Sequence, residues 1–124
     1  MRINIKTTNI TLTPDVSEYL TKRLSALEKL TSWHTEAAIA DVEIGRTTQH
    51  HQTGDVYRAE INIHIGNKSF RAVQETGDLN SSIDAAKDQM MDELRSDKGR
   101  RISRLRRGGQ QIKALIKGMK WWRK

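Results

Sequence analysis

The chain has 124 residues, enough for one domain with a modest core and too few for two ordinary domains. It contains no cysteine, which excludes a disulfide framework and a thiolate metal site and suits a reducing compartment. The N-terminus lacks the apolar run of a secretory signal, and no stretch approaches the roughly 20 apolar residues of a membrane span. These features predict a soluble, cytoplasmic protein.

The net charge of +7 is distributed very unevenly. Residues 1–97 hold 11 Lys and Arg against 15 Asp and Glu, whereas residues 98–124 hold 11 Lys and Arg and no acid. A basic block of this kind usually marks an arm that binds nucleic acid or an anionic membrane surface. We therefore predict one domain over residues 1–98 and a basic tail over residues 99–124.

The predicted elements begin with a strand at residues 2–6, in which Ile3 and Ile5 alternate with polar neighbours. A helix follows from Pro14 to about Leu30, because Thr13 can cap it and proline suits its first position. Its core face is predicted from apolar residues at helical spacing: Val16, Tyr19, Leu20, Leu24, Leu27 and Leu30.

Three strands with alternating apolar residues come next, within residues 37–45, 56–65 and 68–73. One apolar and one polar face predict a sheet that is covered on one side. Gly66 and Asn67 form a two-residue turn of the type with glycine first. The predicted inward residues are Ala40, Val42, Ile44, Ala59, Ile61, Ile63, Ile65, Phe70 and Ala72.

A second helix is predicted after Asp78, which can cap it, and should end near Arg95 to Lys98. Glycines interrupt the basic run that follows, so we expect the first part of the tail to be disordered on its own. The order strand, helix, three strands, helix predicts a two-layer α+β domain, with a four-stranded sheet and two helices on one face. The expected core face of this helix is Leu79, Ile83, Ala86, Met90 and Leu94, with Asp84, Asp88 and Asp92 on its far side.

The segments MRINIKTTNITLTPDVSEYLTKRLSALEKL and YRAEINIHIGNKSFRAVQETGDLNSSIDAAKDQM resemble the ribosome hibernation promoting factor and ribosome-associated inhibitor family, also called ribosomal subunit interface proteins. The likeness covers about residues 1–98. It implies a βαβββα fold that binds rRNA of the small ribosomal subunit, in the mRNA channel and over the tRNA sites. It also implies competition with mRNA and tRNA, and hence steric inhibition of translation and ribosome hibernation under stress, without a catalysed reaction.

Carried over by position, the family's rRNA contacts on the first helix fall on Lys22, Arg23 and Lys29. The second helix keeps Lys87 but lacks two or three cations that relatives show, and basicity resumes at Arg95. The chain shows no counterpart of the C-terminal dimerisation domain of long relatives, so we expect a monomer off the ribosome.

The tail supplies further candidate rRNA contacts, because Lys and Arg neutralise phosphates and unstacked bases stack on tryptophan. We expect an amphipathic helix over residues 110–122 that folds mainly on contact with a partner. An anionic membrane surface is the second candidate partner, since basic amphipathic helices with interfacial tryptophans also bind lipid. Packing on the domain, or a solubilising role, is the third. Together with Lys87 and Arg95 of the second helix, the candidate rRNA contacts are Lys98, Arg100, Arg101, Arg104, Arg106, Arg107, Lys113, Lys117, Lys120, Trp121, Trp122 and Arg123.

Three smaller hypotheses complete the sequence analysis. The basic arm could fold back onto the carboxylates at residues 84, 88 and 92, although a solvated acidic face is the simpler interpretation. His50 and His51 lack cysteines or a carboxylate pattern nearby, so they do not indicate a metal site. No cofactor or small-molecule substrate is expected. Glu60 and His64 share one strand face, which leaves a hydrolase as a minor alternative to a binding protein.

Overall fold

The structure is a computed structural model that describes residues 1–32, 34, 36–47 and 56–115. Its elements follow in the order β1 (Arg2–Thr8), α1 (Pro14–Thr31), β2 (Ala38–Thr47), β3 (Val56–Ile65), β4 (Lys68–Thr76) and α2 (Leu79–Leu115). This βαβββα order confirms the predicted α+β class. No helix in the described part of the chain is both long and apolar enough to cross a membrane.

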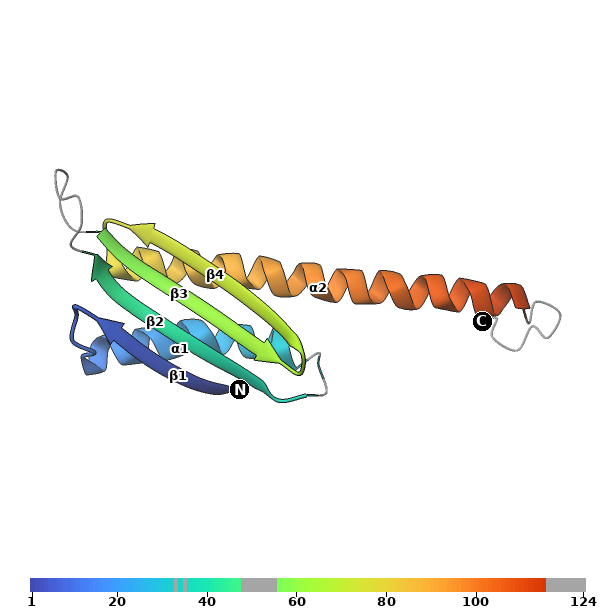
Figure 1. Cartoon of the computed structure of the whole chain (residues 1–124), viewed down its shortest axis with the longest axis horizontal. Coiled ribbons are helices and arrows are strands. Elements are labelled where there is room, and N and C mark those ends of the chain that lie inside the picture. Colours follow the sequence, from blue (N-terminus) through green and yellow to red (C-terminus); the bar gives the residue numbers. More distant parts are fainter. Residues whose placement is uncertain (33, 35, 48–55, 116–124) are drawn as a thin grey trace. The chain divides into compact units, whose positions relative to one another are not determined.

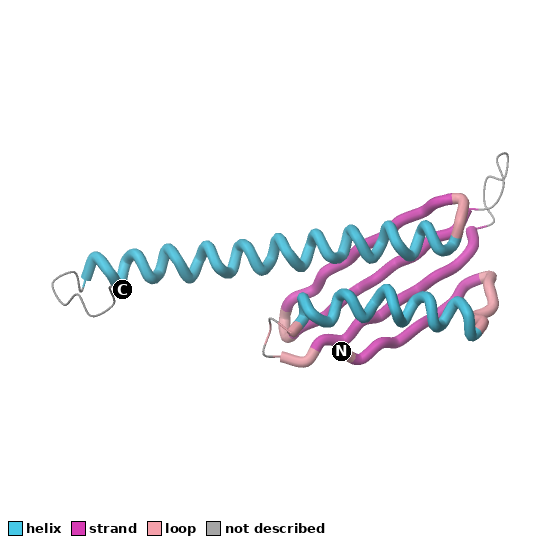
Figure 2. The backbone as a smooth tube through the Cα atoms, turned by 180° about the vertical axis from the view of Figure 1, so that it is seen from behind, coloured by secondary structure: helices cyan, strands magenta, loops and turns pink. Residues whose placement is uncertain are grey.

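The four strands form one sheet in the order β1-β2-β3-β4. β1 runs parallel to β2, and the other neighbouring strands are antiparallel. Figures 1 and 2 show that α1 and the beginning of α2 cover the same face of this sheet. The domain therefore has the two predicted layers, and no described helix covers the other face of the sheet, called the open face below.

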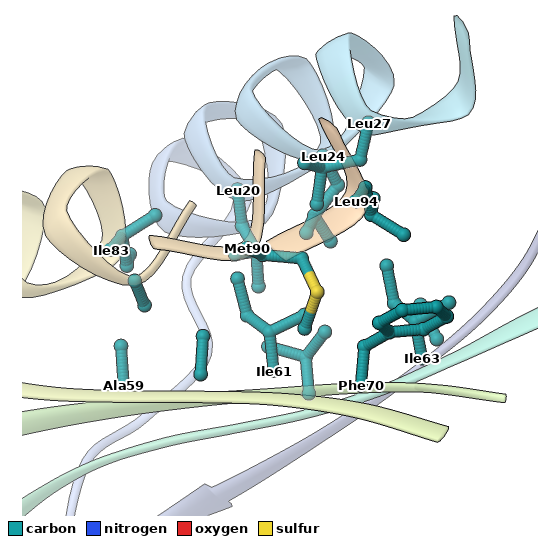
Figure 3. Close-up of a cluster of buried hydrophobic side chains, with 14 of the residues drawn as sticks. Leu20, Leu24, Leu27, Ala59, Ile61, Ile63, Phe70, Ile83, Met90 and Leu94 are labelled. Atoms are coloured by element: carbon teal, nitrogen blue, oxygen red, sulfur yellow. The ribbon is translucent and has the colours of Figure 1, made fainter. Parts of the chain in front are cut away.

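The core lies between the helical layer and the sheet. Figure 3 shows leucines of α1 and apolar side chains of α2 pointing toward the isoleucines of β3 and Phe70 of β4. Val16, Tyr19, Leu30 and Leu79 are half-buried against this cluster. The two apolar periods, near 3.6 in helices and 2 in strands, predicted the core correctly. Its members are Leu20, Leu24, Leu27, Ala38, Ala40, Val42, Ile44, Ala59, Ile61, Ile63, Ile65, Phe70, Ala72, Ile83, Ala86, Met90 and Leu94.

The predicted caps and turn are also confirmed. The Thr13 hydroxyl accepts a hydrogen bond from the Val16 amide at 3.2 Å, and Asp78 Oδ2 accepts one from the Ser81 amide at 2.9 Å. Gly66 has a φ of +61°, as the first position of a type II′ turn requires, and β4 begins two residues later.

The predicted end of the second helix is wrong, because α2 continues to Leu115. Gly99, Gly108 and Gly109 lie inside the helix instead of interrupting it. Each glycine costs only about 1 kcal/mol relative to alanine, and the Arg, Lys, Leu and Gln residues around them favour helix. The chain divides into two compact units, Met1–Leu94 and Arg95–Lys124, so this one helix belongs to both. Only the first part of the predicted helix over residues 110–122 falls within the described residues.

Candidate nucleic-acid interface

Arg23 connects the two helices of the helical layer. Its Nε donates a hydrogen bond to Asp84 Oδ1 at 2.7 Å, which joins α1 to α2. Tyr19, one turn earlier on α1, donates its hydroxyl to Asp84 Oδ2 at 2.7 Å. The guanidinium carbon also lies 4.4 Å from the centre of the Tyr19 ring, within cation–π range.

The ionisation of this cluster follows from these contacts. Burial opposes the charged form of Asp84, but the hydrogen bonds from Tyr19 and Arg23 outweigh it, so the pKa of Asp84 is lowered. The hydrogen bond to Asp84 raises the pKa of Arg23, and the one that Tyr19 makes with Asp84 raises the pKa of the tyrosine. At neutral pH the cluster is therefore an ionised carboxylate that binds a guanidinium and a phenol.

The other predicted cations of the helical layer pair with a carboxylate of their own helix or are exposed. Lys22 Nζ lies 3.3 Å from Glu18 Oε1, and both side chains are largely exposed. Lys87 Nζ lies 2.6 Å from Asp88 Oδ1, and 19% of the Lys87 side chain is exposed. Lys29 is exposed in the last turn of α1, where a cation favours the negative end of the helix dipole. Neither of these ion pairs links α1 to α2, in contrast to the pair of Arg23 and Asp84.

The sequence predicts that Asp84 lies on the far side of α2 with Asp88 and Asp92, and for Asp84 this is wrong. Asp84 faces α1, where it binds Tyr19 and Arg23, because the two helices lie side by side on the sheet. Asp88 and Asp92 are exposed. Asp84 is thus already engaged by α1, and folding of the basic arm onto the other two carboxylates stays a prediction.

Charge reverses along α2. Between residues 79 and 94 it holds one lysine and four acids, whereas between residues 95 and 115 it holds eight Lys and Arg and one acid, Asp97. Arg95 and Arg100 are exposed and Lys98 is half-buried. α2 also includes Arg101, Arg104, Arg106, Arg107 and Lys113, whereas Lys117, Lys120, Trp121, Trp122 and Arg123 lie outside the described residues.

The open face of the sheet contains Glu60 and His64, which the sequence left as a minor hydrolase alternative. The hydrogen bond from Asn62 lowers the pKa of Glu60, with burial opposing it and Arg58 adding to it. A lowered pKa makes a carboxylate a weaker general base. His64 lies against other partners, with Asp41 Oδ2 at 3.5 Å and Ser69 Oγ at 3.1 Å. Glu60 and His64 are therefore members of two surface networks, which disfavours their acting together on a substrate.

Among the described residues, no group of three or more His, Asp or Glu side chains is arranged to hold a metal ion. His50, His51 and Trp33 lie outside those residues. His34 is buried and packs edge-on against Phe70, with ring centroids 6.4 Å apart. This histidine contributes to packing at the end of the core.

The sequence located the cations but not the residues that hold them. Tyr19 was predicted as core, and only its ring behaves so, because its hydroxyl reaches Asp84 from 65 positions away in the chain. A signal for the first half of this cluster is present, since Tyr19 and Arg23 are spaced i, i+4 on one helix. The contribution of Asp84 required the packing of α1 against α2.

Comparison with known proteins agrees with this architecture. Residues 3–102 match the family described as Sigma 54 modulation protein / S30EA ribosomal protein. The chain is similar to the N-terminal domain of Thermus thermophilus Protein Y, with 23% identity and a TM-score of 0.62 over 76% of this chain and 96% of that one. It is similar to a ribosomal subunit interface protein from Coxiella burnetii, with 14% identity and a TM-score of 0.67 over 80% of this chain and 99% of that one. At these identities the structural likeness concerns the fold, whereas the family match extends over most of the chain. The chain therefore belongs to the Sigma 54 modulation protein / S30EA ribosomal protein family, whose members are ribosome-associated proteins.

Proposed function

We propose that this protein binds the small ribosomal subunit in the mRNA channel and over the tRNA sites, and blocks translation sterically. Family membership supports a ribosomal partner, as does the fold that the chain shares with a ribosomal subunit interface protein. The proposal includes a cytoplasmic location, a role in storing ribosomes under stress, and no catalysed step.

The observation that carries this proposal is the charge reversal along α2. In α1 and residues 79–94 of α2, four Lys and Arg stand against seven Asp and Glu, and such a surface attracts RNA weakly. The continuation of the same helix has eight Lys and Arg and one acid. Each phosphate that a cation neutralises releases roughly 0.7 to 0.9 counterions, so this half of α2 can supply most of the affinity for rRNA.

Competition is the direct test of this function. The full chain is co-sedimented with purified small subunits at near-physiological salt, alone and with mRNA and tRNA bound. We expect binding to vacant subunits and displacement by mRNA and tRNA, because a steric inhibitor and its competitors occupy the same path. Binding that mRNA and tRNA leave unchanged would instead indicate a general RNA-binding protein. Failure to bind subunits, together with blue-shifted tryptophan emission on anionic vesicles, would indicate a lipid partner.

A further inference from the structure

The guanidinium of Arg23 is fixed on one side and available on the other. Its hydrogen bond to Asp84 uses Nε, one of the five N–H donors of an arginine side chain. The Tyr19 hydroxyl also lies close enough to contribute to the raised pKa of Arg23, and 40% of the Arg23 side chain is exposed. The remaining donors form the outer edge of the planar group, which is the edge that binds oxyanions in a bidentate manner.

Two contacts restrict how this group can rotate. The Asp84 carboxylate binds Nε at 2.7 Å, and the guanidinium carbon lies over the Tyr19 ring, 4.4 Å from the ring centre. Tyr19 in turn holds the other carboxylate oxygen at 2.7 Å, so each member of the cluster orients the next. A restricted arginine loses less conformational entropy when it binds a ligand than a free one does.

The neighbouring pair of Lys22 and Glu18 provides the contrast. It also consists of one cation and one carboxylate, but their side chains are 70% and 68% exposed. A pair of that kind is screened by solvent, and its geometry is weakly defined. Removing Glu18 therefore changes charge alone, whereas removing Asp84 changes both charge and the orientation of Arg23.

We propose that Asp84 and Tyr19 are positioning residues that hold the guanidinium of Arg23, between α1 and α2, ready to bind a phosphodiester oxygen of RNA. The proposal rests on the proposed function, because rRNA is the ligand that presents the phosphate. According to this proposal, the Asp84 carboxylate strengthens RNA binding. Net charge alone predicts the opposite effect on affinity, since removing an acid should strengthen the attraction for a polyanion.

The test is a double-mutant cycle in the full chain, with Asp84→Ala and Arg23→Ala alone and together. Binding is measured to small subunits and to poly(U) at near-physiological salt. We expect Asp84→Ala to weaken binding about 5- to 10-fold, less than the loss of a whole charge-assisted hydrogen bond, because Arg23 keeps its charge and loses only its orientation. In the Arg23→Ala background the same change should leave binding unchanged or up to about twofold tighter, because only the repulsion is removed.

Three further variants separate positioning from folding. Glu18→Ala is the matched control and should bind as tightly as the parent, or up to about twofold more tightly. Asp84→Asn retains an oxygen that can accept from Arg23 Nε, so it should bind better than Asp84→Ala. Tyr19→Phe keeps the ring and loses the hydroxyl contact, so it should weaken binding by about twofold. Far-UV circular dichroism confirms that each variant is folded at the assay temperature.

The outcomes distinguish this inference from the proposed function. If Asp84→Ala weakens binding equally with and without Arg23, or strengthens it in the parent, Asp84 does not act through Arg23 and the positioning role is overturned. If the parent does not bind subunits, or if mRNA and tRNA do not displace it, the proposed function fails. The cycle on poly(U) still decides the positioning role in that case, because phosphate is the same chemical ligand.

Discussion

The two halves of α2 are stabilised in different ways, although they form one helix. The first half places Ile83, Ala86, Met90 and Leu94 in the core of the domain. The second half, from Arg95 to Leu115, has a high density of cations and three glycines. Most helical stability in proteins comes from packing, whereas like charges spaced i, i+4 destabilise a helix. We therefore expect packing in the core to stabilise the first half, and the stability of the second half to depend on ionic conditions and on ligands.

A core substitution in the first half should have the largest effect. Met90 is fully buried, so Met90→Ala should lower the free energy of unfolding by about 2–4 kcal/mol through lost burial and a cavity. Arg100→Ala, at an exposed position of the second half, should change it by less than about 0.5 kcal/mol. Urea denaturation followed by far-UV circular dichroism measures both. Equal effects would show that the halves are not distinct in stability.

Charge removal from the second half should have the next largest effect, this time on RNA binding. Replacing Arg100, Arg101 and Arg104 by glutamine should weaken subunit binding on the order of 10- to 100-fold and reduce the salt slope of log K by about 2 to 3. The matched control replaces Arg2, Lys6 and Arg71, three exposed cations of the strands. A similar loss in that control would mean that net charge matters and the position on α2 does not.

Replacing a glycine should stabilise the second half of α2, whereas the preceding substitutions weaken stability or binding. Gly99 has no atoms near the position that a Cβ would take, so Gly99→Ala should stabilise the second half of α2 by about 1 kcal/mol without a clash. Hydrogen exchange of amides in residues 95–115 should slow, while exchange in the sheet stays the same. Unchanged exchange in the helix would show that the low helix propensity of Gly99 does not limit the stability of the second half of α2.

Acidification should have the smallest effect, and it should act on the first half. The pKa of Asp84 is lowered in the folded protein, so its contribution to stability is complete above the ordinary carboxyl pKa and is lost as pH falls through the lowered value. The contribution should be at most about 1 kcal/mol, because 41% of the side chain is exposed. Urea midpoints between pH 7 and 3 should fall more for the parent than for Asp84→Asn. Parallel pH profiles would show that Asp84 does not contribute.

Most of the domain follows from local rules. Alternation in the strands, helical spacing in α1 and the caps at Thr13 and Asp78 depend on neighbours in sequence, and all were predicted correctly. The continuation of α2 was missed because glycines inside a helix carry a modest cost, while the same residues at a helix end are favourable. A sequence pattern cannot decide between these cases when strong helix formers lie on both sides.

The candidate site was predicted less completely than the core. Arg23 was identified as a candidate rRNA contact. The structure shows that the guanidinium of Arg23 binds Asp84, because Asp84 lies on the side of α2 that faces α1. Helix-to-helix contacts of this kind depend on how two helices lie on a sheet, which no local pattern contains.

The parallel pairing of β1 with β2 has a consequence for the order of folding. Arg2 pairs with Ile39, which lies beyond all of α1, whereas Ile65 pairs with Lys68 across a two-residue turn. Closing the longer loop costs more chain entropy, so we expect the β3–β4 hairpin to form early and β1 to join the sheet last. Pulse-labelling hydrogen exchange during refolding would show this as late protection of β1 amides, and early protection there would contradict it. During synthesis β1 therefore leaves the ribosome before its partner and stays unpaired with it until β2 has also emerged.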